Sequence, residues 1–286
     1  MTLSPGSSPL RDHVLVREDG RRVGCSEWGD PRGPAVLLLH RNPGSRLLDP
    51  DPAATAAVRL ITLDRPGYGR TDPGDDPNFA AVAADVRAVT DELHLEEVAV
   101  IGWSGGGMFA LETAAVFDER LRSLSLVCTP APDNEIPWMP DDFRPLIASI
   151  AADPSAALAP VTAACSFYAD NPECMVASDP SEADAEVRAV PEVRDALAAM
   201  MREGARQGAI GMASDIVAGC RGDRPSLDEL YIPVRLWYGE ADWIGPEHGY
   251  WYADRIEGSR LNVVASAGHL LPLLKWNAIV TEAIAP

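Results

Sequence analysis

Positive charge is scarce in this chain. Lys275 is the only lysine, and the 24 lysine and arginine residues are outnumbered by 43 aspartate and glutamate residues, which gives a formal net charge of −19. A field of that sign repels the phosphates of nucleic acids and the surfaces of anionic membranes. The composition therefore argues against a nucleic acid or a membrane as a partner, and it says nothing about oligomeric state; the partner that we expect, from the catalytic residues described below, is a small-molecule substrate.

Cysteine is also sparse and scattered. The number of cysteines is odd and no two have the C-x-x-C spacing, so neither a disulfide framework nor a zinc knuckle is indicated. Reduced thiols are usual in the cytoplasm, and we expect a cytoplasmic protein. The five cysteines are Cys25, Cys128, Cys165, Cys174 and Cys220.

Three further features are missing. No stretch approaches the roughly 18 apolar residues of a membrane span, and residues 1–10 lack the basic start and apolar run of a secretion signal. A nucleotide-binding fingerprint is absent as well, because Gly67 and Gly69 are followed by neither a third glycine nor a predicted helix. We expect a chain that is neither secreted nor membrane-spanning, with no organic cofactor and no metal.

What the sequence does contain is an alternation of two kinds of segment. Short runs of valine, leucine and isoleucine are typical of strands buried on both faces of a parallel sheet. They lie at 35–40, 60–64, 98–102, 124–128, 234–238 and 261–264. Helical patterns separate them, for example at 79–93 behind the capping candidate Asn78, and a hairpin over 14–17 and 23–28 precedes them. The alternation predicts an α/β fold with a mostly parallel sheet flanked by helices.

One long segment interrupts this alternation. Between 135 and 224 the sequence has no clear buried strand and is broken repeatedly by proline, which predicts short helices joined by proline-capped turns. We predict a core in two parts, 1–134 and 225–286, with an inserted helical cap over 135–224. The large apolar side chains of the cap either roof a pocket or form the cap's own core. They are Trp138, Met139, Phe143, Phe167, Tyr168, Met175, Met200, Met201 and Met212.

The segment with the most chemical content is G-W-S-G-G at residues 102–106. It lies between a predicted strand and a predicted helix at 105–117, the setting in which G-x-S-x-G forms a tight turn that exposes a nucleophile. The flanking glycines let neighbouring chain pass without a clash against a Cβ atom. At the start of the helix, Ser104 gains a positive potential, and the backbone N–H of Gly105 is available to a developing oxyanion.

A serine hydroxyl is a poor nucleophile at neutral pH and needs a base within hydrogen-bond reach. His269 lies in a loop of small residues after a predicted strand, at the sheet edge from which it can reach Ser104. Asp242 follows the preceding strand and is expected to orient the imidazole, although Glu240 lies closer to the strand end. Three other histidines are not expected to act as the base. His13 is predicted to precede the first strand, His94 to lie at a helix end and His248 to lie in a surface helix.

These segments together resemble the α/β-hydrolase fold superfamily over nearly the whole chain apart from the insertion. The chain order Ser104, Asp242, His269 is the order of that fold. Two loops add to the resemblance, L-D-R-P-G-Y-G-R-T-D at 63–72 and the oxyanion-loop segment L-H-R-N-P-G at 39–44. The resemblance implies a serine hydrolase with a cap, and it implies that Asn42 donates its backbone N–H to the oxyanion beside Gly105.

The oxyanion loop departs from the family pattern at Arg41, which stands where the family has glycine. A positive φ there would cost about 1–3 kcal/mol of strain or change the path of the loop. Arg41 either points outward into solvent or enters the pocket and binds a carboxylate or phenolate. Trp103 and Trp243 adjoin triad residues and are predicted pocket walls, so these three side chains form the expected substrate-binding set.

Three functions remain open at this point. The complete triad favours hydrolysis of a carboxylic ester or lactone of a moderately sized apolar molecule through an acyl-enzyme intermediate. The same groups also serve C–C bond hydrolysis, proline-type aminopeptidase action, and acyl transfer or cyclisation in a biosynthetic pathway, and Arg41 favours such a specialised reaction. A non-catalytic ligand receptor on the same scaffold is the third reading, and the intact triad argues against it.

Overall fold

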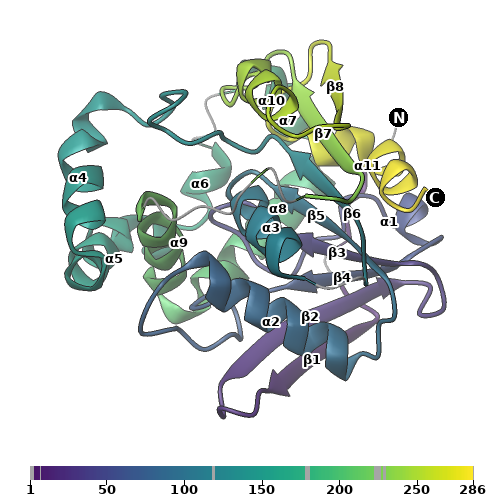
Figure 1. The fold of residues 1–286 in the computed structure, drawn as a ribbon, viewed down its shortest axis with the longest axis horizontal. Helices are drawn as coiled ribbons and strands as arrows, with labels where there is room; N and C mark the ends of the chain where they lie inside the picture. Colours follow the sequence, from purple (N-terminus) through teal and green to yellow (C-terminus); the bar gives the residue numbers. More distant parts are fainter. Residues whose placement is uncertain are drawn as a thin grey trace.

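A computed structural model of the chain describes residues 3–6, 8–117, 120–177, 181–221, 227 and 230–285. Within these residues, eight strands form one sheet in the order β1-β2-β4-β3-β5-β6-β7-β8 (Figure 1). Strand β2 runs antiparallel to both of its neighbours, and all pairs from β4 to β8 are parallel. The strands are β1 (Arg11–Val16), β2 (Arg22–Gly29), β3 (Ala35–Leu39), β4 (Arg59–Leu63), β5 (Val98–Trp103), β6 (Leu121–Val127), β7 (Val234–Gly239) and β8 (Arg260–Val264). The predicted fold class is confirmed.

The central strands are buried on both faces, as their apolar runs predict. The pleat sends Leu37 and Leu39 of β3 into one core cluster and Val36 and Leu38 into another on the opposite face. Helices α2, α3 and α10 pack on the first face and α11 and α1 on the second, which makes a three-layer sandwich. These helices are α1 (Pro52–Thr55), α2 (Phe79–Glu92), α3 (Gly105–Val116), α10 (Pro246–Ala253) and α11 (Leu271–Ala283).

Local signals set several boundaries. Asn78 caps α2 as predicted, because its side-chain oxygen accepts the backbone N–H of Ala81 at 2.8 Å. Helix α1 was not predicted, since four residues are too few to show a helical period. The surface position predicted for His248 is wrong: α10 packs on β7, and buried His248 accepts the N–H of Ala131 at its Nδ1 atom, 3.0 Å away. His13 lies within β1 and not before it.

The insertion is helical, and in Figure 1 its helices α4, α5 and α9 lie to the left of the sheet. Proline begins α5 and α8 as predicted, but Pro160 lies inside α5, so the break predicted there is wrong. Helix α5 buries one side against α9, which outweighs the single backbone hydrogen bond that proline removes. The elements are η1 (Asp141–Phe143), α4 (Arg144–Ala152), α5 (Pro154–Asp170), α6 (Cys174–Ala177), η2 (Glu182–Asp184), α7 (Ala185–Ala189), α8 (Pro191–Gly204), η3 (Ala205–Gln207) and α9 (Ile210–Cys220).

Helices α4, α5 and α9 share a small apolar cluster of their own, as expected of a cap. The predicted cap boundary at 224/225 lies outside the described residues, so the division into 1–134, 135–224 and 225–286 stays a prediction. Among the residues that the structure describes, every helix is too short or too polar to cross a bilayer.

Candidate active site

Ser104 occupies the tight turn between β5 and α3. Its φ and ψ are 55° and −129°, a strained conformation for a residue with a side chain. The turn needs glycine on either side: a Cβ on Gly102 would lie 2.4 Å from the Cα of Gly107, and one on Gly106 would lie 2.3 Å from the carbonyl oxygen of Leu39. The steric reason given for the glycines in G-W-S-G-G is therefore confirmed.

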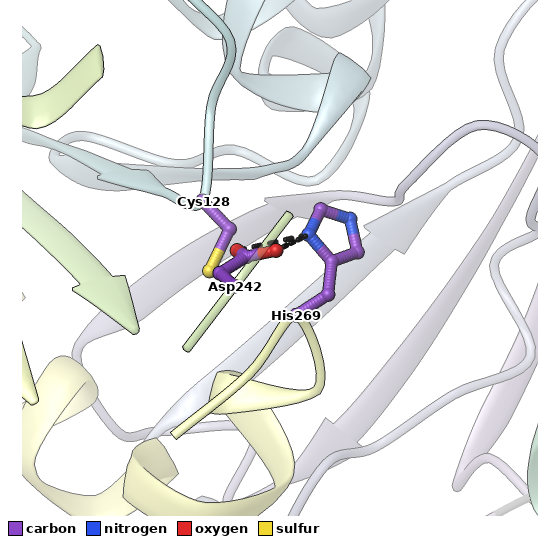
Figure 2. Close-up of side chains that lie close together, drawn as sticks. All are labelled: Cys128, Asp242 and His269. Atoms are coloured by element: carbon purple, nitrogen blue, oxygen red, sulfur yellow. Dashed lines mark hydrogen bonds and ion pairs between the residues drawn. The ribbon is translucent and has the colours of Figure 1, made fainter. Parts of the chain in front are cut away.

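Parallel strands bring the three predicted triad residues to one edge of the sheet. Ser104 follows β5, Asp242 follows β7 and His269 follows β8, and all three side chains are buried. The Ser104 Oγ atom lies 2.8 Å from His269 Nε2, and both carboxylate oxygens of Asp242 lie 3.0 Å from His269 Nδ1 (Figure 2 shows the second contact). Because Nε2 must be free to accept the serine proton, Nδ1 carries the ring proton and donates a hydrogen bond to Asp242. Glu240 is exposed and accepts a hydrogen bond from the backbone of Ser266 instead.

Further contacts hold these groups in place. Asp242 also accepts the backbone N–H of Ile244 at 3.0 Å, which fixes the rotation of its carboxylate. The indole N–H of Trp103 donates to the carbonyl of His269 at 3.0 Å. Asp184 of the cap, fully buried, accepts the N–H of Leu270 at 2.9 Å. The histidine loop is thus anchored from the core and from the cap, and no local pattern in the sequence indicates the contact made by Asp184.

Cys128 directly follows β6, and its side chain lies beside the carboxylate of Asp242 (Figure 2). The ligand atoms of Cys128, Asp242 and His269 lie within 4.8 Å of one another, so metal binding must be considered. Burial raises the pKa of the Cys128 thiol well above its usual range, and the neighbouring Asp242 charge adds to this. Nδ1 of His269 is already engaged by both carboxylate oxygens of Asp242, so two of the three donors are paired with each other. These donors fit a hydrogen-bonded acid and base better than a metal centre.

The two residues predicted to supply the oxyanion donors, Asn42 and Gly105, are neighbours in the structure. The backbone nitrogen of Asn42 is 3.8 Å from the position that a Cβ on Gly105 would take, and both residues line the same cavity as Ser104. Arg41 does not have a positive φ, so the strain considered for this position is absent. Its side chain is 6% exposed and lies over the ring of Trp103, 5.4 Å from the centroid. The outward, solvated position considered for Arg41 is therefore wrong.

A cavity of about 920 Å³ separates Ser104 from the cap, and its wall is mostly apolar. Trp243 lines it, 39% exposed, with its ring centroid 5.2 Å from that of His269. Arg41 and Trp103 are not among the described residues of the wall, so the structure lends no support to their predicted contact with substrate. Trp103 is instead buried behind the histidine loop.

The large side chains of the cap divide between the two predicted roles. Four of them roof the cavity: Trp138, Met139, Phe143 and Met212. Met200 and Met201 belong to the core under the second face of the sheet, whereas Phe167 and Tyr168 are exposed. The side chain of Met175 lies outside the described residues.

Charged groups in the cavity wall are paired with each other or with groups behind the wall. Because each carboxylate of the wall has a cationic partner in the protein, the cavity favours a neutral ligand over an ion. The pairs are Asp133–Arg144, Glu135–Arg255 (3.6 Å) and Asp215–Arg65 (2.5 Å).

Sequence comparison agrees with this architecture. The profile of the alpha/beta hydrolase fold family matches residues 34–275. The chain belongs to this family.

Individual relatives cover several reactions. A proline iminopeptidase of Xylella fastidiosa (strain 9a5c) is 29% identical over 135 residues, which are 44% of this chain and 42% of that protein. A putative 2-succinyl-6-hydroxy-2,4-cyclohexadiene-1-carboxylate synthase of Bacillus subtilis (strain 168) is 26% identical over 89% of this chain and 90% of its own length. A hydrolase structure from Pseudomonas aeruginosa PA01 superposes with a TM-score of 0.73 at 22% identity, covering 98% of this chain and 100% of that one. At that identity the superposition speaks for the fold alone.

Proposed function

We propose that this chain is a serine hydrolase that cleaves a carboxylic ester or lactone of a neutral, largely apolar small molecule. The observation that carries the proposal is the unbroken hydrogen-bond chain from Asp242 through His269 to Ser104, which ends at the floor of the 920 Å³ cavity. Family membership supports hydrolytic chemistry in general, and the apolar wall with paired charges supports a neutral substrate.

In the proposed reaction His269 Nε2 takes the hydroxyl proton while Ser104 Oγ attacks the carbonyl carbon. The carbonyl oxygen becomes an oxyanion that the backbone N–H groups of Gly105 and Asn42 stabilise. His269 then gives its proton to the departing alkoxide, and an acyl-serine remains. Water attacks this ester, again losing its proton to His269, and the acid leaves as Ser104 regains its proton. Asp242 stabilises the imidazolium in both halves.

A second candidate is a specialised reaction of the same catalytic groups on a dedicated metabolite. It is favoured by the match to the synthase from Bacillus subtilis, which extends over nine-tenths of that relative. The third function considered, a non-catalytic ligand receptor, differs from the other two because it does not require a reactive Ser104.

Two parallel measurements distinguish these readings: labelling with a fluorophosphonate probe and turnover of p-nitrophenyl esters. We expect Ser104 to be labelled and the esters to be hydrolysed, and Ser104→Ala to abolish both. Ser166→Ala, an exposed serine on α5, is the matched control and should retain both. Labelling without ester turnover supports the specialised reaction, and a folded protein that is not labelled contradicts both enzymatic proposals.

A further inference from the structure

A buried arginine connects the cap to the oxyanion loop. Arg65 follows β4 and is fully buried, and its guanidinium donates to the backbone carbonyls of His40 and, at 3.3 Å, of Arg41. On its other side it forms a two-point ion pair with Asp215 of α9, with Nε 3.1 Å from Oδ1 and Nη2 2.5 Å from Oδ2. Tyr68 donates its hydroxyl to the same Oδ2 at 2.9 Å. Asp215 therefore holds Arg65 against the loop.

The carbonyl of Arg41 determines where the N–H of Asn42 points. Both belong to one planar trans peptide, in which the C=O and the N–H are directed to opposite sides. A hydrogen bond to this carbonyl therefore fixes the direction of the N–H and also polarises it. His40 adds a second bond, since its Nδ1 lies 2.7 Å from the same carbonyl oxygen. Burial and the charge of Arg65 hold the pKa of His40 well below its usual range, so its ring is neutral and Nδ1 acts as the donor.

We propose that Asp215 is a positioning residue, which through Arg65 aims the Asn42 N–H at the oxyanion formed on Ser104. This inference rests on the proposed function and extends it, because it places one determinant of the oxyanion hole in the cap. The guanidinium also packs on the rings of Tyr68 and Phe109, 5.5 and 4.8 Å from their centroids. Without Asp215 the charge of Arg65 is buried and unpaired, so the guanidinium shifts toward other acceptors and releases the Arg41 carbonyl.

A simpler role for Asp215 would be to attach the cap to the core. The chain contains a comparable attachment that serves as a control. Glu203 of α8 pairs with buried Arg46 of the core at 2.6 Å. The other ion pairs of Arg46 are with the carboxylates of Asp12 and Asp64, at 2.7 Å each. Glu203→Gln weakens a link between cap and core without touching the peptide of Asn42.

The test compares wild type, Asp215→Asn and Glu203→Gln on a p-nitrophenyl ester and on the matching thionoester, in which sulfur replaces the carbonyl oxygen. Sulfur accepts hydrogen bonds weakly, so the thionoester depends less on the oxyanion hole. Loss of a whole donor lowers kcat by about 10²–10³-fold. For a misaligned donor we expect Asp215→Asn to lower kcat for the ester by about 10–100-fold, with KM and thionoester turnover changed less than about threefold. Glu203→Gln should leave both substrates within about twofold.

Arg65→Lys supplies a second readout, because lysine keeps the charge but lacks the planar fork. If Asp215 acts through Arg65, adding Asp215→Asn to Arg65→Lys lowers kcat no further. Circular dichroism and thermal unfolding check that each variant is folded. Should the Asp215 variant not fold, Tyr68→Phe removes one donor to the same carboxylate and is expected to lower the ester-to-thionoester ratio of kcat by about two- to fivefold.

The inference is overturned if Asp215→Asn keeps the kcat of wild type, if both substrates slow equally, or if Glu203→Gln has the same selective effect. An unchanged ratio in Tyr68→Phe counts against it as well. A failure of the proposed function would give a different result, because wild type would then neither hydrolyse esters nor react with the fluorophosphonate. In that case the role of Asp215 in an oxyanion hole is excluded as well.

Discussion

Two carboxylates that follow β7 differ in what surrounds them. Asp242 is buried and touches the imidazole of His269 with both oxygens, whereas Glu240, two residues earlier, is exposed and accepts only a long backbone hydrogen bond. The two residues offer a matched test of the triad, because replacing either carboxylate by its amide removes one negative charge from the same loop.

We expect Asp242→Asn to lower kcat for a p-nitrophenyl ester by about 10³–10⁴-fold, since the amide favours the wrong tautomer of His269 and cannot stabilise the imidazolium. Glu240→Gln should change kcat less than about threefold. Steady-state kinetics on both variants decide the point, and similar rates for the two would exclude Asp242 as the acid.

Asp49 is a buried carboxylate outside the site and makes the stability of the fold depend on pH. Burial raises its pKa from the usual 3.8 to about 6, although Thr55 donates a hydrogen bond to it at 2.6 Å. Between these two values the folded chain holds a proton that the unfolded chain has lost. The free energy of unfolding therefore falls as pH rises through this window.

Asparagine at this position does not titrate. As the pH rises from 4 to 7, the free energy of unfolding of Asp49→Asn is expected to increase by about 1–3 kcal/mol relative to that of wild type. This is the size of a two-unit difference in pKa. Urea unfolding at pH 4, 5, 6 and 7 measures the difference. A difference that stays constant over this range contradicts the assignment.

At the scale of elements, the short turn η2 supports the loop that carries the base. Asp184 accepts the N–H of Leu270, the residue after His269, and this N–H is buried. Asp184→Ala leaves it without that acceptor, which costs about 1–3 kcal/mol and loosens the loop. We expect a lower free energy of unfolding by that amount and a kcat lowered by about tenfold.

Two neighbouring changes show whether the hydrogen bond is responsible. Asp184→Asn keeps an acceptor and should recover most of the loss in kcat. Glu182→Ala removes an exposed carboxylate from the same turn and should have little effect. If Asp184→Asn is as damaging as Asp184→Ala, the charge and not the acceptor is what the loop requires.

At the scale of the whole molecule, we expect the cavity above Ser104 to limit the size of the substrate. A space of about 920 Å³ with an apolar wall accommodates long acyl chains, and each buried methylene contributes about 0.8 kcal/mol, or up to about fourfold in kcat/KM. We expect kcat/KM to rise from acetyl through butyryl to octanoyl esters of p-nitrophenol.

Narrowing the cavity should weaken that preference for long acyl chains. Ile147 of α4 lines the wall, and Ile147→Trp is expected to lower kcat/KM for the octanoyl ester by about tenfold while sparing the acetyl ester. Phe167→Trp adds bulk to an exposed position on α5 and serves as control. An unchanged preference for chain length in Ile147→Trp would mean that the acyl chain lies elsewhere.

Much of the architecture follows from local patterns. Buried runs mark the strands, Asn78 marks the start of α2, and the glycines around Ser104 mark a turn that no larger residue allows. Because parallel strands end at one edge of a sheet, the loops of Asp242 and His269 could be expected to meet Ser104, and they do. The sequence alone therefore determines the fold class and where the candidate triad lies.

Tertiary packing alone decided the rest. Several features depend on contacts between segments far apart in the chain. They are the burial of Arg41 and His248, the hydrogen bond from Leu270 to Asp184, and the ion pair between Arg65 and Asp215. No period or turn signal encodes such contacts, since they depend on how elements far apart in the chain pack against one another. The volume of the cavity is decided in the same way, because it is the space that two packed surfaces leave between them.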